Sequence, residues 1–159
     1  MKLSDKALRV AASGALLCII GPGCLARPVT QAAPSTKDSF ASSASQQDVD
    51  KVDILFGNEA EIKSLYQVDT FEAALEATRK EAKIAALTRS EKGSVVVRGA
   101  ETHAVPAASV AKVVDTTGAG DLYASGFLFG YTHGKPLAEC ARLGAIAAAE
   151  IISHVGARP

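Results

Sequence analysis

The stretch Asp115–Asp121, with the sequence DTTGAGD, is the most informative part of this chain. An apolar, β-branched run at residues 110–114 precedes it, and a second apolar run at residues 122–131 follows it. This order predicts a strand, a glycine-rich turn and the start of a helix. Backbone N–H groups in such a turn point at one spot, where the helix dipole adds partial positive charge. We therefore expect an anion site here, most often one for phosphate.

Asp121 follows the glycine-rich turn directly, so its carboxylate is expected at the edge of the anion site. There it can accept a proton from an attacking hydroxyl group. A carboxylate beside an anion is electrostatically unfavourable, which indicates a chemical rather than a stabilising role. The alternative is a plain strand-to-helix connection in which Asp121 is a favourable acid in the first helical turn.

The motif DTTGAGD resembles the signature of the PfkB/ribokinase family of ATP-dependent sugar and nucleoside kinases. A second motif supports the resemblance, because Asn58-Glu59-Ala60-Glu61 fits an N-x-x-E pattern after the apolar run 52–56. The resemblance covers residues 52–159, and residues 113–131 are most similar to the adenosine-kinase-like branch. It implies a phosphotransferase that uses ATP and an alcohol group as acceptor, in a sugar or a nucleoside such as adenosine.

The resemblance also implies roles for the residues of the signature. Asp121 corresponds to the family's catalytic base. The backbone amides of Gly118, Ala119 and Gly120 correspond to the anion hole that stabilises charge on the transferred phosphoryl group.

Asn58 and Glu61 correspond to the family's N-x-x-E motif, which organises Mg²⁺ and the phosphates largely through water. An amide and a carboxylate suit Mg²⁺, because this ion prefers oxygen ligands and keeps several waters. The alternative is local: Asn58 caps a helix and Glu61 is a favourable acid in its first turn.

Two further groups of residues complete the set of candidates. The stretch Thr88–Gly93, TRSEKG, resembles a T-x-G-x-x-G nucleotide loop, with Ser90 where glycine is commoner. Thr88, Ser90 and Gly93 are its candidate nucleotide contacts, and the alternative is a surface turn between two strands.

Some members of the family bind a monovalent cation near the first aspartate of the signature. Asp115, Thr117 and Gly156 lie at suitable positions for such an ion, so the candidate cofactors are ATP, Mg²⁺ and K⁺.

Composition excludes several classes of function. The chain has 159 residues, of which 17 are Lys or Arg and 17 are Asp or Glu, so its formal net charge is zero. This balance argues against nucleic-acid binding and electrostatic membrane docking. The three cysteines, Cys18, Cys24 and Cys140, lack metal-ligand spacing.

Residues 51–159 alternate between strand and helix patterns, which predicts an α/β fold with a parallel sheet covered by helices. We expect strands at residues 52–56, 84–88, 94–98 and 110–114, with residues 103–106 pairing with 94–98 in a hairpin. We expect helices at residues 59–66, 70–81, 121–133 and 136–154.

Residues 1–50 differ in character from the rest. A charged start and an apolar run at residues 10–26 are typical of a secretory leader, whereas residues 30–47 are typical of a disordered linker. An ATP-dependent kinase belongs in the cytoplasm, so the competing interpretations are export through residues 1–26 and a segment foreign to the fold.

The domain division predicted from these patterns is a leader-like segment, 1–50, and the C-terminal part of a PfkB-type kinase domain, 51–159. Relative to the family, the ribokinase-like fold is then incomplete, because the N-terminal half with the acceptor pocket and lid is missing. We expect little activity from this chain alone, since the acceptor hydroxyl is not positioned. The alternative is a non-catalytic nucleotide-binding module that needs a partner chain or an oligomer.

Overall fold

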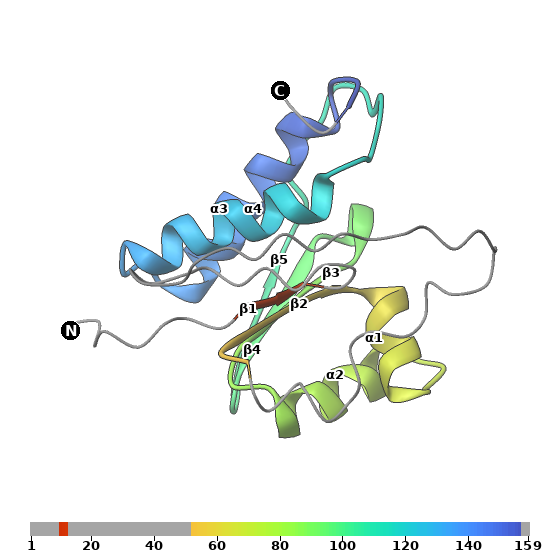
Figure 1. The fold of residues 1–159 in the computed structure, drawn as a ribbon, viewed down its shortest axis with the longest axis vertical. Coiled ribbons are helices and arrows are strands. Elements are labelled where there is room, and N and C mark those ends of the chain that lie inside the picture. The colour runs from red at the N-terminus through yellow and green to blue at the C-terminus, as the bar shows by residue number, and fades with distance from the viewer. Residues whose placement is uncertain (1–9, 13–51, 157–159) are drawn as a thin grey trace, which may run out of the picture.

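A mixed sheet of five strands, in the order β1-β2-β3-β4-β5, organises the described part of the chain, residues 10–12 and 52–156 (Figure 1). In this computed structural model β1 pairs with β2 and β2 with β3 in parallel, whereas β3, β4 and β5 pair antiparallel. The strands are Val10–Ala12 (β1), Ile54–Asn58 (β2), Ala85–Thr88 (β3), Ser94–Arg98 (β4) and Glu101–Val105 (β5). The predicted α/β class and the predicted hairpin are confirmed, and the parallel part of the sheet is limited to three strands.

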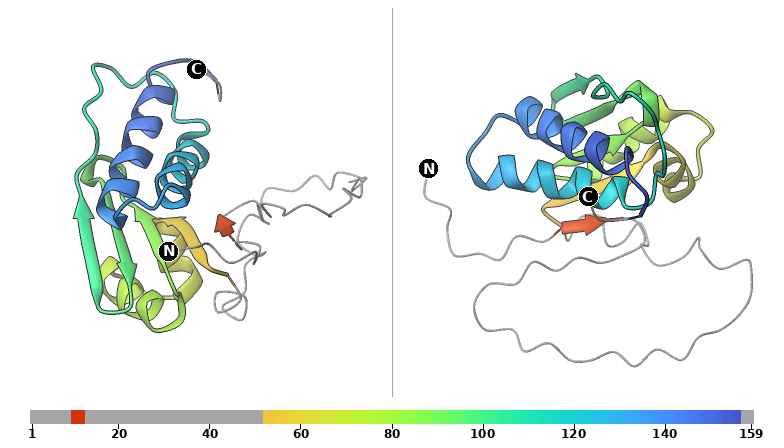
Figure 2. Two further views of the ribbon diagram at one scale, coloured as in Figure 1. Left: turned by 90° about the vertical axis from the view of Figure 1, so that its left-hand side faces the viewer. Right: turned by 90° about the horizontal axis from the view of Figure 1, so that it is seen from above.

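Four helices cover the sheet, two on each face (Figures 1 and 2). They are Glu59–Tyr66 (α1), Phe71–Glu81 (α2), Ala119–Thr132 (α3) and Leu137–Ile151 (α4). Side chains alternate across each strand, so Leu55 and Leu87 join the core under α1 and α2, whereas Phe56 and Ala86 join the core under α3 and α4. The sheet therefore separates two apolar cores.

Local sequence explains where the first two helices begin. Asn58 caps α1 and Thr70 caps α2, each accepting a hydrogen bond from the backbone of the third helical residue. Helix α2 buries Phe71, Ala74 and Thr78 against the sheet. Both helices match their predicted positions.

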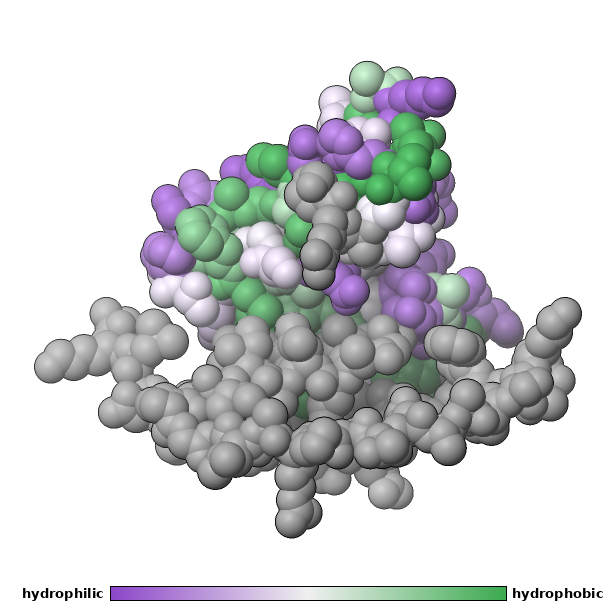
Figure 3. All heavy atoms as spheres, turned by 45° about the horizontal axis from the view of Figure 1, so that its top comes forward, coloured by the Kyte–Doolittle hydropathy of each residue, from purple (hydrophilic) through white to green (hydrophobic). Residues whose placement is uncertain are grey.

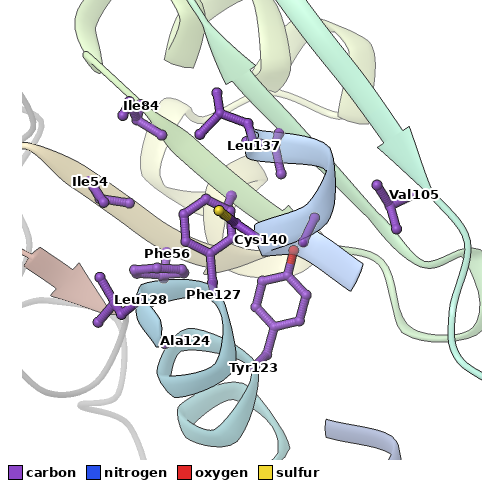
Figure 4. Packing of buried hydrophobic residues seen from close by; sticks show 13 residues of the cluster. Ile54, Phe56, Ile84, Val105, Tyr123, Ala124, Phe127, Leu128, Leu137 and Cys140 are labelled. Atoms are coloured by element: carbon purple, nitrogen blue, oxygen red, sulfur yellow. The ribbon is translucent and has the colours of Figure 1, made fainter. Parts of the chain in front are cut away.

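Glycines allow α3 and α4 to pack closely against each other. A β-carbon on Gly126 would lie 2.6 Å from the Leu143 carbonyl oxygen, and one on Gly144 would lie 2.7 Å from the Tyr123 carbonyl oxygen. Distances below 3 Å are too short for real contacts, so larger residues would force the helices apart. Figure 4 shows side chains from both helices, among them Phe127 of α3 and Cys140 of α4, gathered over the sheet.

The prediction of a strand at residues 110–114 is wrong. Residues 106–116 form an irregular segment, in which Val113 and Val114 are 57% and 46% exposed. The β-branched residues favour a strand, but the Val114 amide donates to the Ile152 carbonyl oxygen at 2.8 Å, at the end of α4, instead of to a neighbouring strand. Other large exposed apolar residues are Phe129, Ile146 and Val155. On the face drawn in Figure 3, apolar (green) surface is interspersed with hydrophilic (purple) surface.

Strand β1 comes from the segment predicted to be leader-like. Val10 pairs with Ile54 and Ala12 with Phe56, so this short piece extends the parallel part of the sheet. The remainder of the predicted leader at 1–26 and the predicted linker at 30–47 lie outside the described residues. Among the described helices, none has the length and apolar character needed to cross a membrane.

Candidate active site

A pocket of about 790 Å³ opens where the parallel strands β2 and β3 end. Ligands in open α/β sheets bind outside the carboxyl ends of the strands, and this pocket has that position. Its lining includes eight of the predicted site residues: Asn58, Glu61, Thr88, Ser90, Gly93, Ala119, Gly120 and Asp121. The structure thus brings together three motifs that are far apart in the sequence.

Asn58 and Glu61 form a capping box at the start of α1. The backbone N–H of Asn58 donates to Glu61 Oε2 at 2.8 Å, and the backbone N–H of Glu61 donates to Asn58 Oδ1 at 2.9 Å. The capping alternative raised from the sequence is therefore realised, and it fixes both side chains beside the pocket. Since an amide and a carboxylate line the pocket together, the donor set fits a Mg²⁺ ion held through water.

The loop after β3 forms the opposite wall. Ser90 has φ 53°, a left-handed conformation that glycine adopts without strain, in agreement with the commoner glycine at this place of the motif. Gly93 has φ 84°, and a β-carbon there would overlap the Val105 carbonyl oxygen. The Arg89 amide closes the loop by donating to the Gly93 carbonyl oxygen at 2.8 Å.

Arg89 connects this loop to α1. Its Nε donates to Glu59 Oε2 at 2.9 Å, and its guanidinium carbon lies 3.9 Å from the centre of the Phe71 ring. The hydrogen bond from Arg89 lowers the pKa of the Glu59 carboxyl below its usual range. No local pattern in the sequence marks Arg89, because its carboxylate partner Glu59 lies 30 positions away.

The first turn of α3 contains residues of the anion site that the signature predicts. Gly118 has φ 81° and caps the helix in a left-handed conformation that requires glycine. The Ala119 amide donates to the Thr116 carbonyl oxygen at 3.2 Å, so this amide is already engaged. The next amides, of Gly120 and Asp121, belong to the first turn, where a helix supplies no acceptor of its own. Gly118 is not among the lining residues, whereas the exposed Asp121 is.

Asp115 and Thr117 lie outside the pocket lining and form a clamp. Asp115 Oδ1 accepts from the Thr117 amide at 2.9 Å and the Thr117 hydroxyl at 2.7 Å, while Oδ2 accepts from the Gly156 amide at 3.0 Å. These hydrogen bonds, first that of the Thr117 amide, lower the pKa of Asp115. The three residues come together as predicted, but both carboxylate oxygens already face N–H and O–H donors. These contacts form a loop clamp, and a monovalent cation at Asp115 and Thr117 stays a prediction.

A wall of small apolar residues was not predicted. It consists of Ala107, Ala108 and Val110 from the irregular segment, with Ala145, Ala148, Ala149 and Ile152 from the end of α4. Apolar walls beside a few convergent polar groups are typical of small-molecule sites. The alanine-rich sequence of α4 was a usable signal, since small side chains leave room beside a helix.

The model of the pfkB family of carbohydrate kinases matches residues 26–159. A cytidine kinase from Thermococcus kodakarensis is 40% identical over 111 residues, which are 68% of this chain and 40% of that protein. An adenosine kinase structure from Sinorhizobium meliloti superposes with a TM-score of 0.69 at 52% identity, covering 71% of this chain and 35% of the other.

A structure of Arabidopsis thaliana ribokinase with ribose and ATP gives a TM-score of 0.64 at 32% identity, covering 69% of this chain and 37% of the other. These superpositions confirm the ribokinase-like fold, and the chain spans 20–42% of the length of five curated relatives. The family match includes residues 26–50, and the division predicted at residue 50 remains a prediction. By this match over most of its length, the chain belongs to the pfkB family of carbohydrate kinases.

Proposed function

We propose that this chain carries the nucleotide-binding and phosphoryl-transfer part of an ATP-dependent kinase whose acceptor is an alcohol group of a sugar or nucleoside. One observation carries the proposal: a single pocket is lined by Asn58 and Glu61, by the loop of Thr88 and Gly93, and by Asp121. Phosphoryl transfer needs positioning, charge stabilisation and a proton acceptor, and these residues supply a candidate for each.

Asp121 is the proposed general base. Its exposed carboxylate at the pocket can accept the proton of the acceptor hydroxyl as the oxygen attacks the γ-phosphate. Gly118, Ala119 and Gly120 form the proposed anion hole. Because the Ala119 amide already donates to the Thr116 carbonyl oxygen, the first-turn amide of Gly120 is its proposed donor to the transferred group.

Thr88, Ser90 and Gly93 are proposed to contact the nucleotide from the facing loop. Asn58 and Glu61 are proposed to hold Mg²⁺ through water, at the end of the pocket where α1 begins. Bound Mg²⁺ supplies charge neutralisation for the phosphates. The small apolar wall of α4 is a suitable surface for the flat base of ATP.

The proposed acceptor class follows from the relatives, which include kinases of cytidine and adenosine and a ribokinase. We propose a nucleoside first, adenosine-like, because the adenosine kinase is 52% identical to this chain. We also propose a cytoplasmic location, since the reaction consumes ATP.

A second candidate is a nucleotide-binding module that is inactive alone and pairs with a partner chain. It is favoured by the extent of the chain, which spans 40% of the cytidine kinase. Under either proposal, residues 51–159 form the C-terminal part of the kinase domain.

Transfer of labelled γ-phosphate to adenosine, cytidine and ribose separates the two candidates. An enzyme transfers phosphate to at least one acceptor and loses this activity in Asp121→Asn. A module transfers no phosphate, but the unchanged chain and Asp121→Asn both bind ATP. The matched control is Asp69→Asn, an exposed aspartate outside the pocket, which should behave as the unchanged protein.

A further inference from the structure

Two buried hydroxyl groups meet at the wall of the pocket. The Tyr123 hydroxyl donates to Ser94 Oγ at 2.8 Å, and the two residues are 4% and 3% exposed. Figure 4 shows the Tyr123 ring leaving α3 with its oxygen directed toward the sheet. Both residues line the pocket, although neither belongs to a motif recognised in the sequence.

The bond connects the two sides of the proposed site. Ser94 begins β4 directly after Gly93, the last residue of the loop proposed to contact the nucleotide. Tyr123 lies two residues after Asp121, in the second turn of α3. A displacement of the start of α3 relative to the loop must therefore break or stretch this hydrogen bond.

The Tyr123 ring is held from several directions. A β-carbon on Gly144 would lie 3.0 Å from the ring, so α4 approaches closely because residue 144 is glycine. The Phe127 ring centre lies 6.4 Å away on the same helix. With the ring fixed, the hydroxyl bond determines where the helix start sits over the sheet.

We propose that Tyr123 is a positioning residue, which through Ser94 sets the first turn of α3 at the distance from the nucleotide loop that a γ-phosphate requires. The inference rests on the proposed function. Burial raises the pKa of Tyr123 to about 12, so its hydroxyl stays protonated and available as a donor at neutral pH.

The test compares ATP–Mg²⁺ and ADP–Mg²⁺ affinity by calorimetry for the full chain, Tyr123→Phe and Ser94→Ala. Because a typical hydrogen bond contributes about 1 kcal/mol, each variant should bind ATP ~5-fold more weakly. ADP affinity should change less than about twofold, since ADP lacks the phosphate that faces α3. The double variant should lose no more ATP affinity than either single variant.

Tyr131→Phe is the matched control, because Tyr131 lies on the same helix and is absent from the pocket lining. It should leave both affinities unchanged. If the hydrogen bond has a purely structural role, Tyr123→Phe lowers the melting temperature but leaves the ratio of ATP affinity to ADP affinity unchanged. That result overturns this inference and leaves the proposed function standing. An unchanged protein that binds neither nucleotide overturns the proposed function, and the inference with it. Ser94→Ala keeps the test valid if Tyr123→Phe does not fold.

Discussion

The Asp115 carboxylate accepts a hydrogen bond from the Gly156 amide, with 3.0 Å between Oδ2 and the nitrogen. The two residues are 41 positions apart, one before the signature turn and the other after α4. Together with the Val114-to-Ile152 bond, this contact attaches the segment that leads into the anion site to the end of the last helix. The signature loop is thereby held at both ends, by α3 and by α4.

Asp115→Ala should lower stability in a pH-dependent way. The folded-state pKa of Asp115 is lowered from its ordinary value of 3.8, so the ionised carboxylate stabilises the fold above that value. The contribution is lost as the pH falls below about 4 toward the folded-state pKa. Melting temperatures from about pH 7 to pH 3 should show a difference between the two proteins that shrinks at the acid end. A difference that grows on acidification contradicts the clamp, and Asp69→Ala is the exposed control.

Gly144→Ala should destabilise the chain by about 1–3 kcal/mol, because the added carbon meets the Tyr123 carbonyl and ring. Denaturant unfolding measures this cost. Gly120→Ala is the control on the facing helix, where an added carbon meets nothing within 4 Å. It should be neutral or up to about 1 kcal/mol more stable, since alanine favours helices. Equal effects of the two substitutions are incompatible with close α3–α4 packing.

Arg89→Ala should loosen the contact between the nucleotide loop and α1. The stacking of Arg89 on Phe71 alone contributes about 1 kcal/mol, and the Glu59 carboxylate loses its partner. Arg98→Ala is the control, because Arg98 forms an exposed ion pair with Glu101 within the β4–β5 hairpin. Thermal unfolding should show a clearly lower melting temperature for Arg89→Ala and almost no change for Arg98→Ala. The reverse order counts against the role given to Arg89.

Ser90→Gly should stabilise the chain by about 0.5–1 kcal/mol. A non-glycine residue in the left-handed region costs about 1–2 kcal/mol, and the greater unfolded-state freedom of glycine offsets part of the gain. Gln67→Gly, at the other non-glycine residue with positive φ in the described part of the chain, should act in the same direction. A loss of stability at residue 90 alone means that the Ser90 side chain makes a contribution that its backbone conformation does not explain.

Local signals explain which parts of the fold were predictable. Asn58 and Thr70 cap their helices through neighbouring backbone groups, so the sequence alone places α1 and α2. The apolar segment at 110–114 shows the opposite case. Its strand propensity is real, but a strand needs a partner, and its hydrogen bonds go to α4 instead.

The candidate site was predictable only in part, for a similar reason. The motifs containing Asn58 and Asp121 identify which residues gather, because glycine turns and capping residues leave a local pattern. The Ser94–Tyr123 bond depends on how α3 lies over β4, which no local pattern encodes. The sequence correctly groups Asp115 with Thr117 and Gly156. Only the structure shows which donors its carboxylate accepts hydrogen bonds from.

Titration of the purified chain with ATP–Mg²⁺ in a calorimeter, with Asp121→Asn alongside, tests whether this pocket is a nucleotide site for phosphoryl transfer. We expect saturable binding in both proteins, because Asp121 is a proposed proton acceptor and the loop and the helix start are proposed to hold the nucleotide. Absence of binding by a chain whose far-UV spectrum shows it to be folded would mean that the pocket is not a nucleotide site.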